Sequence, residues 1–439
     1  MQGSVEFVDA TNSVSQAVQS QLEACCARAL ADWLALLPSP HPLTIKLSVV
    51  SHLEADRFAE AHLAGLKTIA NRDQGGVFLM THAAYKAIMG IDNNPDEADV
   101  HVRISRSAVD ALSYDGTIDA QHRFDATTLF RHELAHALFM TDSLNPNDDN
   151  VTIWQNNIDK LYDGVPRFLG GNVRALFPDG VPLDGSSHVE EAFASQHGSP
   201  LALKPPENRA MELSQLDRAF MSDCGLPTAL NDRMRLGEWV RGTIDMGEGI
   251  DTVIIQAPQK AYTISYEQEG VLLHLNTRYF PHGRPDLGFY PELKLLNTER
   301  VHFSDKILAF DTEGHAGSAY RLCKAVYGDN PLGPLVAEGL DALDNGKTCQ
   351  QFASDLVATD QFATRFDATD SSNDLVAQFY KGILGRAPDA AGETFWRGCM
   401  QNGLGKEELL SHFAECPEYK EISAPELGRV LTINTSDLT

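Results

Sequence analysis

One short segment of the sequence holds side chains at a spacing that suits a metal ion. Residues 131–142 read RHELAHALFMTD, with His132 and His136 four positions apart and Glu133 beside the first. On an α-helix, side chains four residues apart differ by about 40° in direction and about 6 Å in height, so both imidazoles can reach one tetrahedral ion. Glu133 would then lie beside an open coordination position, where a carboxylate can take a proton from an attacking water. The motif predicts zinc-assisted hydrolysis of an amide.

A catalytic zinc site needs a third protein ligand, and three candidates lie downstream. Asp142 has the spacing of the pattern HExxHxxGxxH/D, but Phe139 replaces the glycine, and a continuing helix would carry Asp142 about 15 Å along its axis. His188 follows a Gly-Ser-Ser turn that could present its ring to the helix. Glu190 and Glu191 are the third candidate, since a glutamate on a second helix can complete a zinc site. The residues alone leave the choice open.

The motif must be positioned by a helix and by the elements that cover it. Apolar residues at helical spacing predict a helix over 125–140 and another over 14–37, which a Pro-rich segment ends. Runs rich in β-branched residues predict strands over 43–50, 75–80 and 98–104. This order of elements indicates an α/β or α+β module.

The second half of the chain changes character twice. Residues 252–310 hold short β-rich runs separated by Gly, Pro and Asn, which predict a small β module. The later residues are helical in pattern and repeat at an offset of 57 positions. The matching pairs are Gly328 and Gly385, Pro331 and Pro388, Gly346 and Gly403, Phe362 and Tyr419, Leu322 and Phe379, and Leu356 and Phe413.

The composition narrows the classes of function. With 35 Lys and Arg against 61 Asp and Glu, the 439-residue chain has a net charge of −26, which argues against a nucleic-acid binder. It contains no run of about 18 apolar residues, so no transmembrane segment is expected. The N-terminus lacks the regions of a secretory signal. The seven cysteines form no CxxC pair and predict no disulfide framework.

Three segments together resemble a known group of enzymes. HELAHALF, the later SSHVE and the segment LSQLDRAFMSDCGL at 213–226 resemble secreted bacterial zincins of the leishmanolysin-like kind, over roughly residues 95–226. The resemblance implies a zincin fold in which His132 and His136 bind zinc, Glu133 is the general base and His188 is the third ligand.

A second resemblance lies in the C-terminal half. LGRAPDAAGETFW at 384–396 looks like the LGRxPDxxGxxYW repeat of bacterial type I secreted and surface-layer-associated proteins, and the resemblance covers about residues 250–420. It implies export without a cleaved N-terminal signal, and contact of the C-terminal region with the cell surface or the secretion machinery. We interpret the motif as structural, with Gly385 ending a helix and Trp396 anchoring a core. Its acidic residues could bind calcium (Ca2+), although the sequence holds no GGxGxDxxx nonapeptide.

We therefore expect an α+β protein in four parts. These are a zincin-type metallopeptidase domain with a mixed sheet and an active-site helix over 1–245, a small β-rich module over 246–313, two helical repeats over 314–422 and a tail over 423–439. The expected function is that of a secreted zinc metalloendopeptidase acting on proteins or peptides. One alternative is a surface or matrix adhesion protein with a degenerate zinc domain. Another is a structural zinc closed by Asp142 or Glu191 as fourth ligand.

Overall fold

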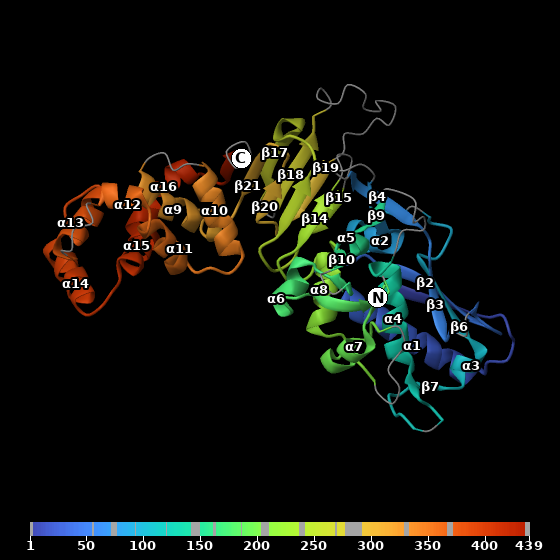
Figure 1. The fold of residues 1–439 in the computed structure, drawn as a ribbon. Coiled ribbons are helices and arrows are strands. Elements are labelled where there is room, and N and C mark those ends of the chain that lie inside the picture. Colours follow the sequence, from blue (N-terminus) through green and yellow to red (C-terminus); the bar gives the residue numbers. More distant parts are fainter. Residues whose placement is uncertain are drawn as a thin grey trace. The chain divides into compact units, whose positions relative to one another are not determined.

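The computed structural model describes most of the chain. The chain forms two compact units, each held together by its own internal contacts (Figure 1). Unit 1 comprises Met1–Gln256 and Lys260–Thr298, and unit 2 comprises Ala257–Gln259 and Glu299–Thr439. Unit 1 mixes sheets and helices and unit 2 is largely helical, so the chain is an α+β protein as expected. The described residues are 3–54, 57–71, 77–92, 94–119, 121–141, 150–160, 164–185, 187–202, 210–236, 242–267, 270–276, 292–328, 333–366 and 372–434.

A four-stranded mixed sheet forms the N-terminal part of unit 1. Its order is β1 (Gly3–Asp9), β2 (Leu43–Val50), β6 (Val100–Ser105) and β3 (Ala59–Leu63). β1, β2 and β6 are parallel, and β3 runs antiparallel to β6 at the edge. β2 has the predicted bounds, and β6 overlaps the strand predicted over 98–104. The sequence did not indicate β1, whose residues form a strand through their pairing with β2.

Two helices pack against each other beside this sheet (Figure 1). They are α1 (Gln16–Leu34) and α4 (Ala126–Leu138), which confirm the two predicted helices with slightly shorter bounds. The indole N–H of Trp33 on α1 donates to the backbone oxygen of Arg131 on α4 at 2.9 Å. α1 contacts β1 and α4 contacts β3, so the motif helix lies against the edge strand of the sheet.

The remaining elements of unit 1 are mostly short. Their strands form the groups β4–β5–β9, β7–β8, β10–β11–β12–β13, β14–β16 and β15–β19–β18–β17. The elements are β4 (Leu66–Asn71), β5 (Val77–Thr81), α2 (His82–Met89), α3 (Arg106–Val109), β7 (Leu112–Ser113), β8 (Phe124–Asp125), β9 (Val151–Thr152), α5 (Ile153–Asn156), β10 (Ile158–Lys160), β11 (Pro166–Phe168), α6 (Gly171–Leu176), β12 (Val181–Asp184), β13 (His188–Val189), α7 (Glu191–His197), α8 (Gln215–Asp223), β14 (Arg233–Leu236), β15 (Gly242–Asp245), β16 (Thr252–Ile255), β17 (Tyr262–Glu267), β18 (Gly270–Leu275) and β19 (Glu292–Leu296).

Unit 2 combines helices with a small antiparallel sheet. β20 (Arg300–His302), β21 (Lys306–Ala309) and β22 (Leu431–Asn434) are consecutive neighbours in that sheet. The helices are α9 (His315–Tyr327), α10 (Gly333–Asp344), α11 (Cys349–Val357), α12 (Asp360–Arg365), α13 (Ser372–Gly382), α14 (Ala390–Gln401), α15 (Lys406–Glu415) and α16 (Pro417–Leu427). None of the helices in the described residues is long and apolar enough to cross a membrane.

The helices of unit 2 follow the repeat read from the sequence. α13, α14, α15 and α16 begin 57 residues after α9, α10, α11 and α12 respectively, for example at positions 372 and 315. The matched core positions Leu322 and Phe379 are both fully buried. Trp396 packs on Phe413 with ring centroids 5.5 Å apart, and Gly385 has a φ of +70°, which suits glycine. Of the matched positions, Pro331 lies outside the described residues.

Two segments are organised in a way that the sequence did not indicate. The strands within 246–313 are divided between the units, because β16 to β19 lie in unit 1 and β20 and β21 lie in unit 2. The expected tail at 423–439 contains the end of α16 and strand β22. β22 is only four residues long and becomes a strand by pairing with β21, a contact that its local sequence does not reveal.

Candidate metal centre

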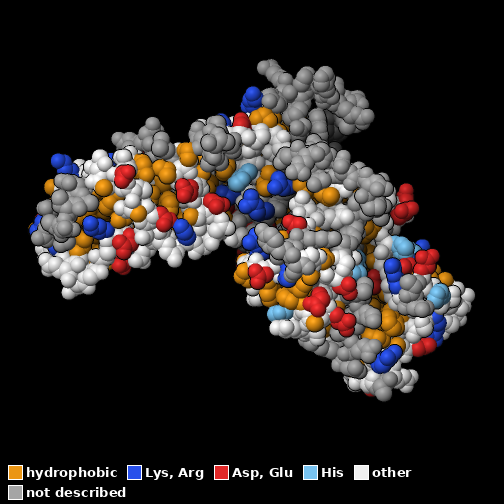
Figure 2. Space-filling view, in the orientation of Figure 1, with side chains coloured by type: hydrophobic (Ala, Val, Ile, Leu, Met, Phe, Trp, Pro, Cys, Tyr) orange, Lys and Arg blue, Asp and Glu red, His pale blue; other side chains and the backbone are white. Residues whose placement is uncertain are grey.

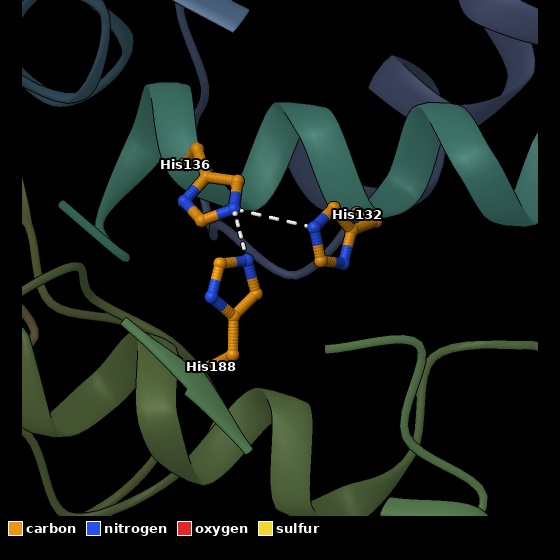
Figure 3. Close-up of side chains that lie close together, drawn as sticks. All are labelled: His132, His136 and His188. Atoms are coloured by element: carbon orange, nitrogen blue, oxygen red, sulfur yellow. Dashed lines mark hydrogen bonds between the residues drawn. The ribbon is translucent and has the colours of Figure 1, made fainter. Parts of the chain in front are cut away.

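Helix α4 and strand β13 bring three of the predicted site residues together. His132 and His136 lie one turn apart on α4, and His188 is the first residue of β13. The Nε2 atom of His136 lies 3.2 Å from Nε2 of His132 and 3.1 Å from Nε2 of His188. Figure 3 shows the three rings directing these nitrogens toward one another. The group could therefore hold a metal ion.

The outer nitrogen of each α4 histidine faces a backbone oxygen. Nδ1 of His132 lies 3.0 Å from the oxygen of Pro200, and Nδ1 of His136 lies 2.7 Å from the oxygen of Met140. Because a carbonyl oxygen can only accept, each Nδ1 carries the proton and donates it. Nε2 of each neutral ring then presents a lone pair to the centre, which is the form that binds a metal. Two such lone pairs at 3.2 Å repel each other unless a cation lies between them.

The hairpin of β12 and β13 positions the third ring. Asp184 pairs with His188 in this hairpin, and Gly185 takes a φ of +75° in the turn between the strands. Val189, the next residue, is fully buried. Since neighbouring side chains on a strand point to opposite faces, burial of Val189 turns His188 the other way, toward α4. The hydroxyl oxygen of Ser187 lies 3.2 Å from Nδ1 of His188 and can accept a hydrogen bond from that nitrogen.

Buried polar groups fix the first turns of α4. The Asp125 carboxylate caps the helix by accepting from the N–H of Thr128 at 2.7 Å and from its hydroxyl at 2.8 Å. The Thr128 hydroxyl oxygen in turn accepts from the N–H of Met211 at 2.8 Å. The Arg131 guanidinium donates to Asp32 on α1 and to the backbone oxygen of Met211. The helix therefore cannot rotate without breaking several buried hydrogen bonds.

Glu133 follows the first histidine and is buried, with 6% of its surface exposed. Its carboxyl accepts a hydrogen bond from the backbone N–H of Ala61 on β3. Burial raises the pKa of Glu133 to about 8, although the Ala61 hydrogen bond and the charge of Arg57 act in the opposite direction. A carboxyl with this pKa exchanges its proton near neutral pH, as a general acid or base must.

The pKa values of two histidines shift downward. Burial lowers the pKa of His132 well below its usual value, and the neighbouring His136 and His188 lower it further. Burial also lowers the pKa of His188 to about 4, with smaller contributions from His136 and Arg57. Both rings are therefore neutral at pH 7, which is the protonation state that a metal requires.

The other proposed ligands do not join this group. Glu190 and Glu191 are exposed at the start of α7. Within the part of the chain that the structure describes, the metal-binding group consists of the three histidines and includes neither glutamate. Asp142 lies outside the described residues. His188 is thus the candidate that the structure brings to the α4 pair.

Phe139 occupies the place of the glycine in the pattern HExxHxxGxxH/D without requiring a glycine conformation. Its φ is −149°, and its N–H donates to the backbone oxygen of Ala135. Its buried ring lies edge-on to Trp33, with ring centroids 5.2 Å apart, and near Trp154, with centroids 6.2 Å apart. The helix ends at Leu138, before its predicted end at 140, because the chain turns there into this aromatic contact.

Sequence reasoning missed the groups that orient the rings and the carboxyl. They are the backbone oxygens of Pro200 and Met140 and the N–H of Ala61. Backbone oxygens and N–H groups occur along the whole chain, so their role leaves no residue-type signal. The sequence contained one local signal for the Met140 oxygen. Met140 lies four residues after His136, at the expected end of the helix, where backbone oxygens have no partner within the helix.

The spacing of these nitrogens suits a tetrahedral metal ion. With zinc–nitrogen distances of about 2.0–2.1 Å, two ligands of a tetrahedral ion lie about 3.3–3.4 Å apart. The observed separations of 3.1 and 3.2 Å are close to that spacing, so the rings would need only small shifts to bind. Calcium prefers six to eight oxygen ligands, which this nitrogen group does not supply.

Comparison with known proteins adds one match. Residues 353–422 match a domain of unknown function (DUF4214). The matched segment runs from within α11 into α16, so it lies in the helical part of unit 2 and includes the LGRAPDAAGETFW segment. No curated protein matches the chain.

Proposed function

We propose that this chain is a zinc-dependent metalloendopeptidase of the zincin type. The observation that carries the proposal is the convergence of three Nε2 atoms, at 3.2 and 3.1 Å from the central one, beside a helix that also carries the buried carboxyl of Glu133. Two of these nitrogens have their lone pairs oriented by backbone oxygens on the far side of the ring, which is how proteins commonly prepare histidines for a metal.

Among the residues that the structure describes, the metal-binding group holds three ligands, which favours a catalytic site over a structural one. His132, His136 and His188 would hold zinc through Nε2. Structural zinc sites are closed by four protein ligands, whereas catalytic sites use three and keep one position for water or substrate. When bound, zinc polarises the scissile carbonyl and lowers the pKa of the attacking water.

Glu133 would move the protons of the reaction. Its carboxylate takes a proton from the attacking water and then passes that proton to the leaving amine nitrogen. Burial raises the pKa of Glu133 to about 8, and the positive charge of bound zinc would lower it again, toward the range in which the group can both accept and donate a proton. The N–H of Ala61 holds the carboxyl in place.

The edge strand β3 offers a place for an extended substrate. β3 pairs with β6 on one side, and its other edge pairs with no strand among the described residues. β3 also contacts α4 and donates a hydrogen bond to Glu133. A peptide that adds to this open edge would form main-chain hydrogen bonds and pass near the carboxyl. Proteins or peptides are therefore the substrate class that we propose.

The enzyme would act outside the cell. The support for this part of the proposal is the resemblance of residues 384–396 to repeats of type I secreted proteins. The helices of unit 2 would then contact the cell surface or the secretion machinery. The match of residues 353–422 is to a domain without a known activity, so it assigns unit 2 no chemistry.

Replacement of the proposed base tests the mechanism. We expect Glu133→Gln to keep one zinc per chain and to lower the rate of casein cleavage by about 10²- to 10⁴-fold, because the amide cannot accept the proton. Glu190→Gln is the matched control, since it removes an exposed carboxylate two positions from His188, and it should change neither quantity. Full activity in Glu133→Gln, or a zinc-loaded wild type without any cleavage, would reject the proposal. The second result would favour an adhesion protein.

A further inference from the structure

One short segment, residues 199–202, contacts the surroundings of two candidate ligands. The backbone oxygen of Pro200 accepts from Nδ1 of His132 at 3.0 Å. The next backbone oxygen, that of Leu201, accepts from the N–H of Val189 at 2.9 Å, on the strand that begins with the third histidine. A displacement of this segment would therefore disturb both α4 and β13 at the centre.

Ser199 anchors the segment. Its side chain is buried, and its hydroxyl donates to the carboxylate of Asp217 on α8 at 2.5 Å. The same hydroxyl oxygen accepts from the N–H of Leu201 at 3.3 Å, and the Ser199 N–H donates to the backbone oxygen of Ala194 at 3.0 Å. The ring of Pro200 fixes its φ angle, so few free torsions separate the Ser199 anchor from the Pro200 oxygen.

The carboxylate that holds Ser199 lies inside the protein. Figure 2 shows Asp and Glu side chains on the visible faces of both units, whereas Asp217 has 0% of its surface exposed. Burial raises the pKa of Asp217 to about 6, so at pH 7 the group is mainly ionised and can only accept. A buried carboxylate is retained only where hydrogen bonds compensate its lost hydration.

The two oxygens of Asp217 have different partners. One oxygen accepts from the N–H and the hydroxyl of Ser214, each at 2.7 Å, in the capping box at the start of α8. The other oxygen accepts from Ser199. Capping of the helix accounts for the first oxygen, and the second one links α8 to the segment beside the metal centre.

We propose that Asp217 is a positioning residue of the candidate metal centre. It holds Ser199, which in turn fixes the Pro200 oxygen. That oxygen keeps the proton of His132 on Nδ1 and so directs the Nε2 lone pair to the metal. This inference deepens the proposed function, because it concerns the same zinc site. It also gives a role to the segment at 213–226, which the proposed mechanism does not otherwise use.

Two serine variants form a matched test. Ser199→Ala and Ser214→Ala each remove one hydroxyl from the Asp217 carboxylate, but only the first hydroxyl is linked to His132. We expect Ser199→Ala to weaken zinc binding about 10-fold, at the lower end of the range for groups that orient a ligand. Ser214→Ala should leave the zinc Kd within about two-fold. Both variants should unfold at lower urea concentrations, because each loses hydrogen bonds to a buried carboxylate.

Replacement of Asp217 itself separates position from charge. In Asp217→Asn, the amide oxygen can accept from Ser214 while the amide nitrogen donates to the Ser199 hydroxyl oxygen, so the link persists without the charge. This variant should keep the zinc Kd within about three-fold, whereas Asp217→Ala should lose at least as much affinity as Ser199→Ala. Cobalt(II) bound in place of zinc reports ligand geometry through its visible spectrum. The spectrum should change in Ser199→Ala and not in Ser214→Ala, a result that decides the matter if Asp217→Ala does not fold.

The outcomes separate this inference from the proposed function. Equal zinc Kd values and equal cobalt spectra for the two serine variants would overturn it, because Asp217 would then only cap α8. A loss of affinity in Asp217→Asn as large as in Asp217→Ala would also overturn it, because charge and not position would then matter. A protein that shows the expected zinc affinities but cleaves no peptide would refute the peptidase proposal and leave the role of Asp217 in place.

Discussion

Removal of His188 should weaken zinc binding at least 100-fold. Nε2 of His136 already lies 3.2 Å from Nε2 of His132 and 3.1 Å from Nε2 of His188. Zinc would therefore gain the bond to His188 with little rearrangement of the protein. Loss of a group that only orients a ligand commonly costs about 10- to 100-fold in affinity, and loss of the ligand itself costs more. His188→Ala is therefore expected to exceed the upper end of that range.

The same change can be expressed as a free energy of unfolding. At free zinc of about 1,000 times the wild-type Kd, zinc adds about 4.1 kcal/mol to the stability of the folded protein. For a variant with 100-fold weaker binding, that zinc concentration is about 10 times Kd and adds about 1.4 kcal/mol. The zinc-dependent gain in stability should thus fall by about 2.7 kcal/mol.

Two measurements with matched controls check this prediction. Competition with a zinc-binding dye gives Kd, and urea denaturation with and without zinc gives the gain in stability. Glu191→Ala and Asp142→Ala remove two of the other proposed ligands and should leave Kd within about two-fold. Retained affinity in His188→Ala, or a 100-fold loss in either control, would refute the assignment of the third ligand.

Two further predictions concern stability. Burial raises the pKa of Asp232 from 3.8 to about 7, so between these values the folded protein holds a proton that the unfolded chain has lost. The free energy of unfolding should therefore fall as pH rises from about 4 to 7. In Asp232→Asn, urea denaturation at several pH values should show a weaker dependence of this free energy on pH. An unchanged pH dependence would contradict the prediction. A Cβ on Gly339 in α10 would lie 2.4 Å from the Phe352 ring, whereas a Cβ on Gly398 in α14 would meet nothing within 4 Å. Gly339→Ala should cost about 1–3 kcal/mol by overpacking, and Gly398→Ala should gain up to about 1 kcal/mol of helix propensity. Equal Tm values for these two variants would show that the packing argument is wrong.

Local patterns in the sequence predicted the features that depend on neighbouring residues. The spacing of His132 and His136 placed both rings on one side of a helix, because helix geometry is set within a few residues. The apolar period of 125–140 and the β-branched run of Leu43–Val50 located α4 and β2 within two residues. The offset of 57 residues likewise anticipated the order of the helices in unit 2.

Tertiary structure alone decided the rest. His188 is 52 residues from His136, and it was one of several candidates until the hairpin of β12 and β13 brought it to the same centre. The Pro200 oxygen that orients His132 comes from a segment 68 residues away, and the Ala61 N–H that binds Glu133 comes from a separate strand. A helix brings together residues three and four apart by its own geometry, whereas contacts between distant segments depend on how the whole chain packs, and no spacing rule reports that.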